Sequence, residues 1–234
     1  LSPSSAASDV YKRQVVIRAN GEPTYFCSDI AYVPNKENRG YNKLIDIWGA
    51  DHHGYIIRIH SAMKFLGYDP EDFEIMLLQM VTLLRDGQPV KMSKRTGQAV
   101  TLRELMDEVG SDAARYFFCS RTLDSQMDFD IDLAKKQSSD NPVYYIQYAN
   151  ARIHSLFAQA KEAGVKWGDW EKTDFTKLTE ECELDLVKKM ENYHMLIDGA
   201  AKERAPQRVA KYAYELALSL IHISEPTRPE PISY

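Results

Sequence analysis

The sequence has few cysteines, no excess of positive charge and no long apolar run. Cys27, Cys119 and Cys182 lie far apart and form no C-x-x-C pair, which argues against a zinc ribbon and a disulfide framework. No apolar segment approaches the roughly 20 residues that a membrane-spanning helix requires. The formal net charge of -5 repels nucleic acid, so any such partner must meet a local basic patch. We therefore expect a protein of a reducing compartment, with neither a membrane nor DNA as partner.

What the sequence does contain is ordinary for a folded protein. Hydrophobic residues make up 44% and charged residues 27% of the 234 positions. This composition is too hydrophobic for a disordered chain. The length is sufficient for one large domain or two small ones, each with a core of its own.

The two ends differ from the middle. Residues 1–14 are rich in serine and show no periodicity, and residues 219–234 carry three prolines where a helical period stops. Both resemble translated cloning or adapter sequence, and we expect them to be non-native tails. Native disordered termini are the alternative.

Residues 15–139 alternate between strand-like and helix-like segments. The stretch VVIRANGEPTYFCSDI, residues 15–30, predicts two short strands around the turn NGEP. A helix capped by Ser28 or Asp29 is expected next, running to Gly40, with Pro34 kinking it or ending it early.

The next segments predict a parallel sheet. KLIDIWGA, residues 43–50, reads as a buried strand, and a helix with apolar positions from Ile56 to Leu66 follows. The apolar run of residues 73–87 is of strand type, although its length also admits a helix, and residues 101–121 predict two helices that meet at Gly110. Strand, helix and strand in this order indicate an α/β domain with crossover helices.

From residue 140 to residue 218 only helical periodicity remains. A first helix follows Asn141, a second spans the apolar positions from Leu184 to Ala201, and Pro206 opens a third. We expect a helical bundle whose last period ends at Leu218.

A possible ligand site follows the strand of residues 43–50. Gly49 would let a ligand approach the backbone, and Asp51 could cap the following helix or accept a hydrogen bond from a ribose hydroxyl. A purely structural role remains open, because strand-Gly-x-Asp-helix is a common pattern. A metal site built on His52, His53 and His60 is disfavoured, because adjacent residues face different sides of a helix.

The loop PVKMSKRTG, residues 89–97, carries a second candidate site. Lys91 and Lys94 place two mobile ammonium groups around Ser93, between the flanking glycines Gly87 and Gly97. Such a loop could close over a triphosphate and stabilise charge on a leaving pyrophosphate. A solvated surface loop is the alternative.

Three motifs occur in a recognisable order: WGADHHGY at 48–55, VKMSKRTG at 90–97 and SDNPVYYIQYANARI at 139–153. Together they resemble arginyl-tRNA synthetases, a family of class I aminoacyl-tRNA synthetases. The resemblance implies the carboxyl-terminal half of a Rossmann-like catalytic domain over residues 15–139. It implies a truncated anticodon-binding-type helical domain over residues 140–218.

The resemblance also implies an activity: L-arginine reacts with ATP and Mg²⁺ to give arginyl-adenylate, and arginine is then transferred to its tRNA. Lys91 and Lys94 correspond to the catalytic lysines of this family. The residues implied in ATP binding are Gly49, Asp51, His52, Met80, Val81, Lys91, Met92, Ser93 and Lys94. No protein-bound metal is expected, and the resemblance implies a monomer in the cytoplasm.

Arginine selection is implied for the stretch TYFCSD. Tyr25 and Asp29 match a family pair, four positions apart, that meets the substrate side chain, and His52 is a further candidate for this pocket. A carboxylate accepts two parallel hydrogen bonds from a guanidinium, which lysine cannot offer. The structural alternatives are a helix cap for Asp29 and a buried strand aromatic for Tyr25.

The sequence departs from the family at one essential motif. No H-x-G-H occurs anywhere in it, although class I synthetases carry such a motif in the first half of their nucleotide fold. We therefore expect a fragment that is inactive alone and exposes a sheet edge and an apolar face. The alternatives are a non-catalytic tRNA-binding fragment and another class I synthetase.

Overall fold

A computed structural model describes residues 15–90, 100–166, 168 and 170–224, in two compact units. Unit 1 comprises residues up to Met80 together with Leu123–Gln126, and unit 2 comprises Val81–Thr122 and the residues from Met127 onward. Over the described ranges, no helix is both long enough and apolar enough to span a membrane.

Unit 1 is a parallel pair of strands with two helices. Strands β1 (Leu44–Gly49) and β2 (Phe73–Leu78) pair over their whole length, from Leu44 opposite Phe73 to Gly49 opposite Leu78. The other elements are α2 (Tyr25–Glu37), the 3₁₀ helices η1 (Ala50–Tyr55) and η2 (Pro70–Asp72), and α3 (Ile56–Phe65). The predicted parallel strands with a crossover helix are confirmed.

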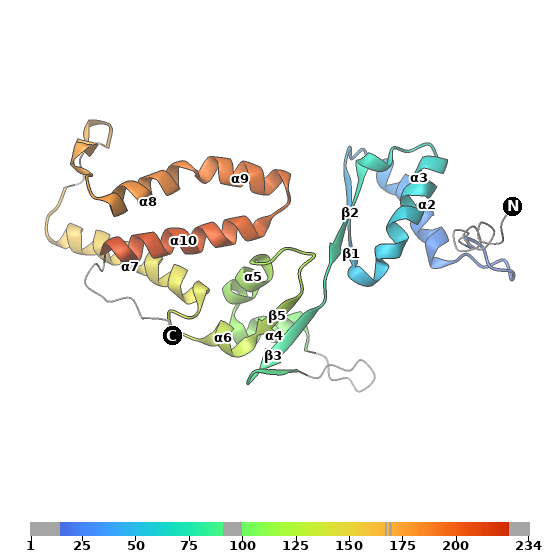
Figure 1. The fold of residues 1–234 in the computed structure, drawn as a ribbon, viewed down its shortest axis with the longest axis horizontal. Coiled ribbons are helices and arrows are strands. Elements are labelled where there is room, and N and C mark those ends of the chain that lie inside the picture. Colours follow the sequence, from blue (N-terminus) through green and yellow to red (C-terminus); the bar gives the residue numbers. More distant parts are fainter. Residues whose placement is uncertain (1–14, 91–99, 167, 169, 225–234) are drawn as a thin grey trace, which may run out of the picture. The chain divides into compact units, whose positions relative to one another are not determined.

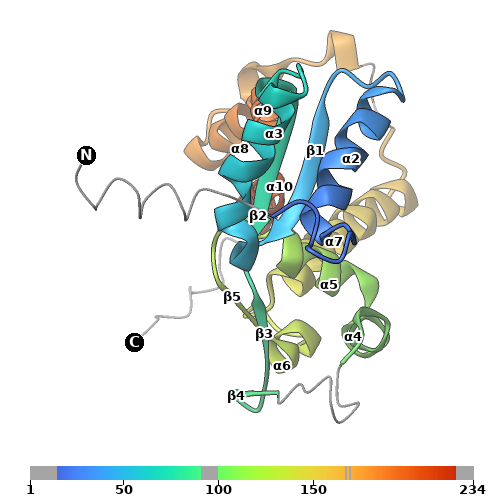
Figure 2. The ribbon, with the colours of Figure 1, turned by 90° about the vertical axis from the view of Figure 1, so that its right-hand side faces the viewer.

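The core of unit 1 lies between the strand pair and its helices. The alternation of β1 turns Leu44 toward α2 and α3, where it joins a cluster of buried side chains from α2, α3 and β2: Phe26, Val33, Ile59, Met63 and Phe73. Both helices lie on the same face of the pair (Figure 2). The intervening positions Ile45 and Ile47 are 42% and 62% exposed, so the expected apolar face is present.

The start of unit 1 corrects two predictions. Only an isolated bridge between Ile17 and Pro23 forms, and no second strand follows, because Thr24 begins a helix there. The Thr24 hydroxyl accepts a hydrogen bond from the Cys27 N–H at 3.3 Å, so Thr24 is the cap, not Ser28 or Asp29. Pro34 lies inside α2, which ends three residues later at Glu37.

Unit 2 begins with a mixed sheet. Strand β3 (Val81–Arg85) lies between β4 (Gln88–Pro89), which is antiparallel to it, and β5 (Met127–Asp130), which is parallel to it. The turn between β3 and β4 needs left-handed backbone at Asp86 and Gly87, with φ of 51° and 68°. The apolar run of residues 73–87 thus forms two strands rather than a helix.

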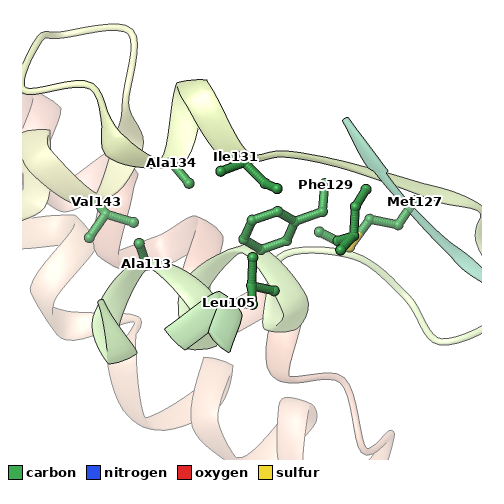
Figure 3. Packing of buried hydrophobic residues seen from close by; sticks show 8 residues of the cluster. Leu105, Ala113, Met127, Phe129, Ile131, Ala134 and Val143 are labelled. Carbon is green, nitrogen blue, oxygen red and sulfur yellow. The ribbon is translucent and has the colours of Figure 1, made fainter. Parts of the chain in front are cut away.

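Short helices cover this sheet. They are α4 (Leu102–Val109), α5 (Ser111–Cys119) and α6 (Ile131–Lys135), and Gly110, with φ of 86°, joins the first two as predicted. Their core surrounds Phe129, which is 0% exposed and belongs to the same buried cluster as Leu105, Ala113 and Ile131 (Figure 3).

The rest of unit 2 is helical. Its elements are α7 (Pro142–Glu162), η3 (Trp170–Lys172), η4 (Phe175–Lys177), α8 (Glu181–Glu191), α9 (Tyr193–Lys202) and α10 (Pro206–Ser224). Helix α10 packs against α7, α8 and α9 (Figure 1). Buried Asn141 caps α7: its side chain accepts from the Val143 N–H and donates to the carbonyls of Ala134, in α6, and Lys136, which follows α6.

Two helical predictions are wrong in detail. The second predicted helix is two helices, because the chain breaks at Asn192, which ends α8 and begins α9. The third does not stop at Leu218: α10 continues to Ser224, and Ile221 is buried at 8% exposure beside Ala149 and Ala217.

Replacing Phe129 with alanine tests the core of unit 2. Removing a fully buried phenylalanine costs about 3–5 kcal/mol through lost burial and the cavity left behind. The expected result is a lower urea midpoint for unfolding, measured by circular dichroism. Phe175→Ala, at a position 59% exposed in the same unit, is the matched control and should leave the midpoint nearly unchanged. Equal losses in both variants would contradict this core.

Candidate functional site

The first turns of α2 present Tyr25 and Asp29 to solvent. Tyr25 is the first residue of the helix and is 88% exposed, which excludes the buried strand aromatic. Asp29 lies in the second turn with an exposed side chain, so it does not cap the helix. Residues four apart are neighbours on a helix surface. The carboxylate of Asp29 forms no hydrogen bond or ion pair with any residue that the structure describes.

The second group of predicted residues follows β1. Gly49 ends the strand and precedes η1 without a side-chain cap, so Asp51 does not cap a helix here either. The predicted helix begins only at Ile56, after this 3₁₀ segment. Asp51 and His52 are exposed, and the Asp51 Oδ2 and His52 Nε2 atoms lie 3.7 Å apart.

The Asp51 carboxylate occupies the space that a side chain at Gly49 would need. A Cβ atom on Gly49 would lie 2.6 Å from the Asp51 Oδ1 atom, well inside van der Waals contact. The backbone φ of -63° at Gly49 is open to any residue, so the glycine is needed for space and not for its conformational freedom. The missing side chain leaves the Asp51 carboxylate folded back over the end of β1.

Tyr55 joins the two groups. Its ring lies 5.9 Å from the ring of Phe26 on α2 and 5.9 Å from that of His52 on η1, both edge-on. Because Phe26 directly follows Tyr25, the beginning of α2 lies beside η1. The structure therefore brings Tyr25, Asp29, Gly49, Asp51 and His52 to one end of unit 1, which sequence spacing alone did not show.

The remaining predicted residues lie farther along the chain. Met80 follows β2 outside both strands and is 81% exposed, at the end of unit 1. Val81 is the first residue of β3, half-buried in unit 2, and pairs with Met127. Lys91, Met92, Ser93 and Lys94 lie outside the described residues.

The stretches flanking residues 91–99 are firmly held in unit 2. The Val90 N–H donates to the Leu83 carbonyl at 2.8 Å. On the other side, Thr101 and Glu104 form a reciprocal capping box at the start of α4. The backbone and side-chain hydrogen bonds from Thr101 hold the pKa of the Glu104 carboxyl below its usual value.

Sequence reasoning missed the residues that hold these groups in place. Tyr55 is one, and the ion pair between Lys36 and Asp46, which joins α2 to β1, is another. One signal was available: Asp46 interrupts the apolar strand LIDIWG, and an acid at a strand position of this kind needs a partner. In the part of the chain that the structure describes, no group of three or more histidine, cysteine or acidic residues is placed to hold a metal.

Comparisons with known proteins bear on both units. Residues 8–129 match the family model for the catalytic domain of class I tRNA synthetases (R). Residues 146–222 match the model for the DALR anticodon binding domain.

Individual proteins agree with these models. The arginine–tRNA ligase of Desulforamulus reducens is 52% identical over 206 residues, and that of Carboxydothermus hydrogenoformans is 51% identical. Each match covers 88% of this chain but 37% of the relative, so the chain spans little more than a third of the length of these relatives.

Solved structures give the same result. A Campylobacter jejuni structure, titled as an arginyl-tRNA synthetase, is 42% identical with a TM-score of 0.81, over 92% of this chain and 46% of that one. The Thermus thermophilus arginyl-tRNA synthetase shares the fold at 20% identity, with a TM-score of 0.73, over 93% of this chain and 43% of that one. With the catalytic-domain model matched over more than half of the sequence, the chain belongs to the arginyl-tRNA synthetase family of class I aminoacyl-tRNA synthetases.

Proposed function

We propose that this chain supplies the arginine-binding helix, part of the ATP site and a helical tRNA-binding region to an arginine–tRNA ligase. The enzyme would activate L-arginine with ATP to arginyl-adenylate and transfer arginine to its tRNA. The observation that carries the proposal is the exposed, unpartnered carboxylate of Asp29 on α2, at the same end of unit 1 as the glycine and acid that follow β1.

Arginine recognition would depend on Asp29. An exposed carboxylate without a partner is available to a ligand, and a guanidinium offers it two parallel N–H donors. A substrate with a single ammonium group cannot form this pair. Tyr25, one turn earlier and almost fully exposed, would flank the substrate side chain with its ring. The edge-on contact with the Tyr55 ring places His52 at the same end of the unit.

ATP binding would use the end of β1. The absence of a side chain at Gly49 makes room for the Asp51 carboxylate at the strand end, and this carboxylate would accept a hydrogen bond from a ribose hydroxyl. His52 stands beside Asp51. We place the adenine near the backbone of Met80 and Val81, on the strength of the family resemblance.

The phosphate chemistry would fall to the loop with Lys91, Met92, Ser93 and Lys94. Two lysines and a hydroxyl provide positive charge and a donor where negative charge develops on the departing pyrophosphate. Mg²⁺ would arrive with ATP as its counterion. Because the sequence contains no H-x-G-H, we propose that the chain alone does not complete the reaction.

The partner of the helical region would be tRNA. The match of residues 146–222 to an anticodon-binding model supports this assignment. We further propose a monomeric enzyme of the cytoplasm, where tRNA is charged for protein synthesis. A tRNA-binding chain without catalysis remains the second candidate, supported by the missing H-x-G-H motif.

An exchange enzyme makes the proposal testable. In it, residues 15–218 of this chain replace the matching segment of the Desulforamulus reducens ligase, which is 52% identical. Arginylation of tRNA by this enzyme is expected. A folded exchange enzyme that binds tRNA but neither arginine nor ATP would favour the second candidate.

Asp29→Asn in the exchange enzyme is expected to weaken arginine binding selectively. Loss of a charge-assisted pair costs about 1.5–3 kcal/mol, so the Kd for L-arginine should rise roughly 10- to 100-fold. The Kd for ATP should change little, and isothermal titration calorimetry measures both. Asp72→Asn, at an exposed acid of the same unit, is the control for charge alone. Unchanged arginine binding in the Asp29 variant would remove Asp29 from the pocket.

Gly49→Ala is expected to have the opposite selectivity. The added Cβ would meet the Asp51 Oδ1 atom at 2.6 Å and displace the carboxylate that we assign to the ribose. The Kd for ATP should rise, while the Kd for L-arginine and the unfolding temperature stay close to those of the parent. Gly54→Ala, where an added Cβ meets nothing within 4 Å, is the matched glycine control. Normal ATP binding by the Gly49 variant would place the nucleotide elsewhere.

Lys94→Ala is expected to slow the chemical step strongly with little effect on folding. Removing one group that stabilises transition-state charge costs about 10²–10³ in kcat. ATP–pyrophosphate exchange in the presence of tRNA reports this step. Lys64→Ala, at an exposed lysine of α3, should leave the rate unchanged. A Lys94 variant with the parent's exchange rate would rule out its catalytic role.

A further inference from the structure

Lys36 is held between three elements of unit 1. Its ammonium group pairs with the carboxylate of Asp46, and the two side chains are only 16% and 24% exposed. The same Nζ atom lies 4.9 Å from the ring centroid of Tyr32 and 5.2 Å from that of Phe73. The cation therefore joins α2, which carries Lys36 and Tyr32, to Asp46 on β1 and to Phe73 at the start of β2.

Stability alone is a poor explanation for such a pair. Removing two charges from water costs free energy that their attraction only partly offsets, and apolar side chains of similar size often stabilise a protein equally well. What an ion pair adds is direction, because its charged atoms must meet at one distance and orientation. This pair thus fixes how α2 is rotated and how far along β1 it lies.

Both members of the pair are connected to the proposed substrate site. Lys36 follows Asp29 by seven positions on α2, which is about two helical turns or roughly 10 Å, so both side chains lie along one side of the helix. Asp46 precedes Gly49 by three positions on β1. The pair therefore connects the helix of the arginine-binding residues to the strand that ends at the ATP-binding residues.

The ring contact between α2 and η1, at the end of α2 near the proposed substrate site, is less directional than the ion pair. Near the start of α2, Phe26 meets Tyr55 through an edge-on ring contact at 5.9 Å, which tolerates sliding and rotation. Two parallel hydrogen bonds to a guanidinium require donor–acceptor distances of about 2.7–2.9 Å and therefore tolerate little movement. The ion pair supplies the directional contact that the ring contact lacks.

We propose that Lys36 and Asp46 are positioning residues for arginine recognition. By fixing the rotation and position of α2 on β1, the pair holds the Asp29 carboxylate where it meets the substrate guanidinium beside the bound nucleotide. The inference rests on the proposed function, and it assigns a role to two residues that need not touch any substrate.

The decisive experiment replaces the pair with apolar residues. In the exchange enzyme, Lys36→Met combined with Asp46→Leu keeps the bulk of both side chains and removes both charges. The expected result is an unfolding temperature equal to or above that of the parent, an unchanged Kd for ATP, and a Kd for L-arginine raised about tenfold, because small displacements of binding groups are costly. Calorimetric titration and differential scanning calorimetry provide these values.

Lys43→Met is the matched control. Lys43 directly precedes β1, and its Nζ atom donates to the Glu71 carbonyl of η2 at 2.6 Å, a hydrogen bond that does not involve α2. Its loss should leave the Kd for L-arginine unchanged.

Each other outcome has a defined meaning. A stable double variant with the parent's arginine affinity would overturn the positioning role, and so would a double variant that unfolds early and loses both ligands. An unaltered exchange enzyme that binds no arginine would instead refute the proposed function, and the inference with it.

Discussion

The packing of α2 on the β1–β2 pair is the constraint on which the candidate site depends. Phe26 and Val33 bury one side of the helix against the strands and α3, which leaves Tyr25 and Asp29 on an adjacent, exposed side. The same packing brings the beginning of α2 to η1, where Gly49 and Asp51 follow the strand. Without it, the two groups would be separated by about twenty residues of chain and share no surface.

Local chemistry explains why each part of unit 1 lies where it does. The Thr24 hydroxyl fixes the first residue of α2, which determines the direction of every side chain after it. The missing side chain of Gly49 leaves room for the Asp51 carboxylate, and Tyr55 fills the space between α2 and η1. A glycine, an acid and an aromatic ring within seven residues thus form one end of the unit.

The sequence predicted elements where a single periodicity dominated. The strand at β1, the helix pair meeting at Gly110 and the helix opened by Pro206 were found in this way. Prediction from the sequence failed where local signals competed. The β-forming residues Tyr25 and Phe26 concealed a helix start at Thr24, and continuous apolar spacing concealed the break at Asn192. Motifs predicted site residues, but the partners of Tyr55 and Asp46 are set by tertiary contacts, and the sequence indicates only that an acid inside β1 needs a partner.

The most direct test of arginine recognition by α2 is a crystal structure of the exchange enzyme soaked with L-arginine. The position of the guanidinium is the quantity to measure. The proposed function predicts both of its terminal nitrogens within hydrogen-bonding distance of the Asp29 carboxylate, with the ring of Tyr25 alongside. A bound arginine whose guanidinium meets other groups, with Asp29 still exposed to solvent, would contradict it.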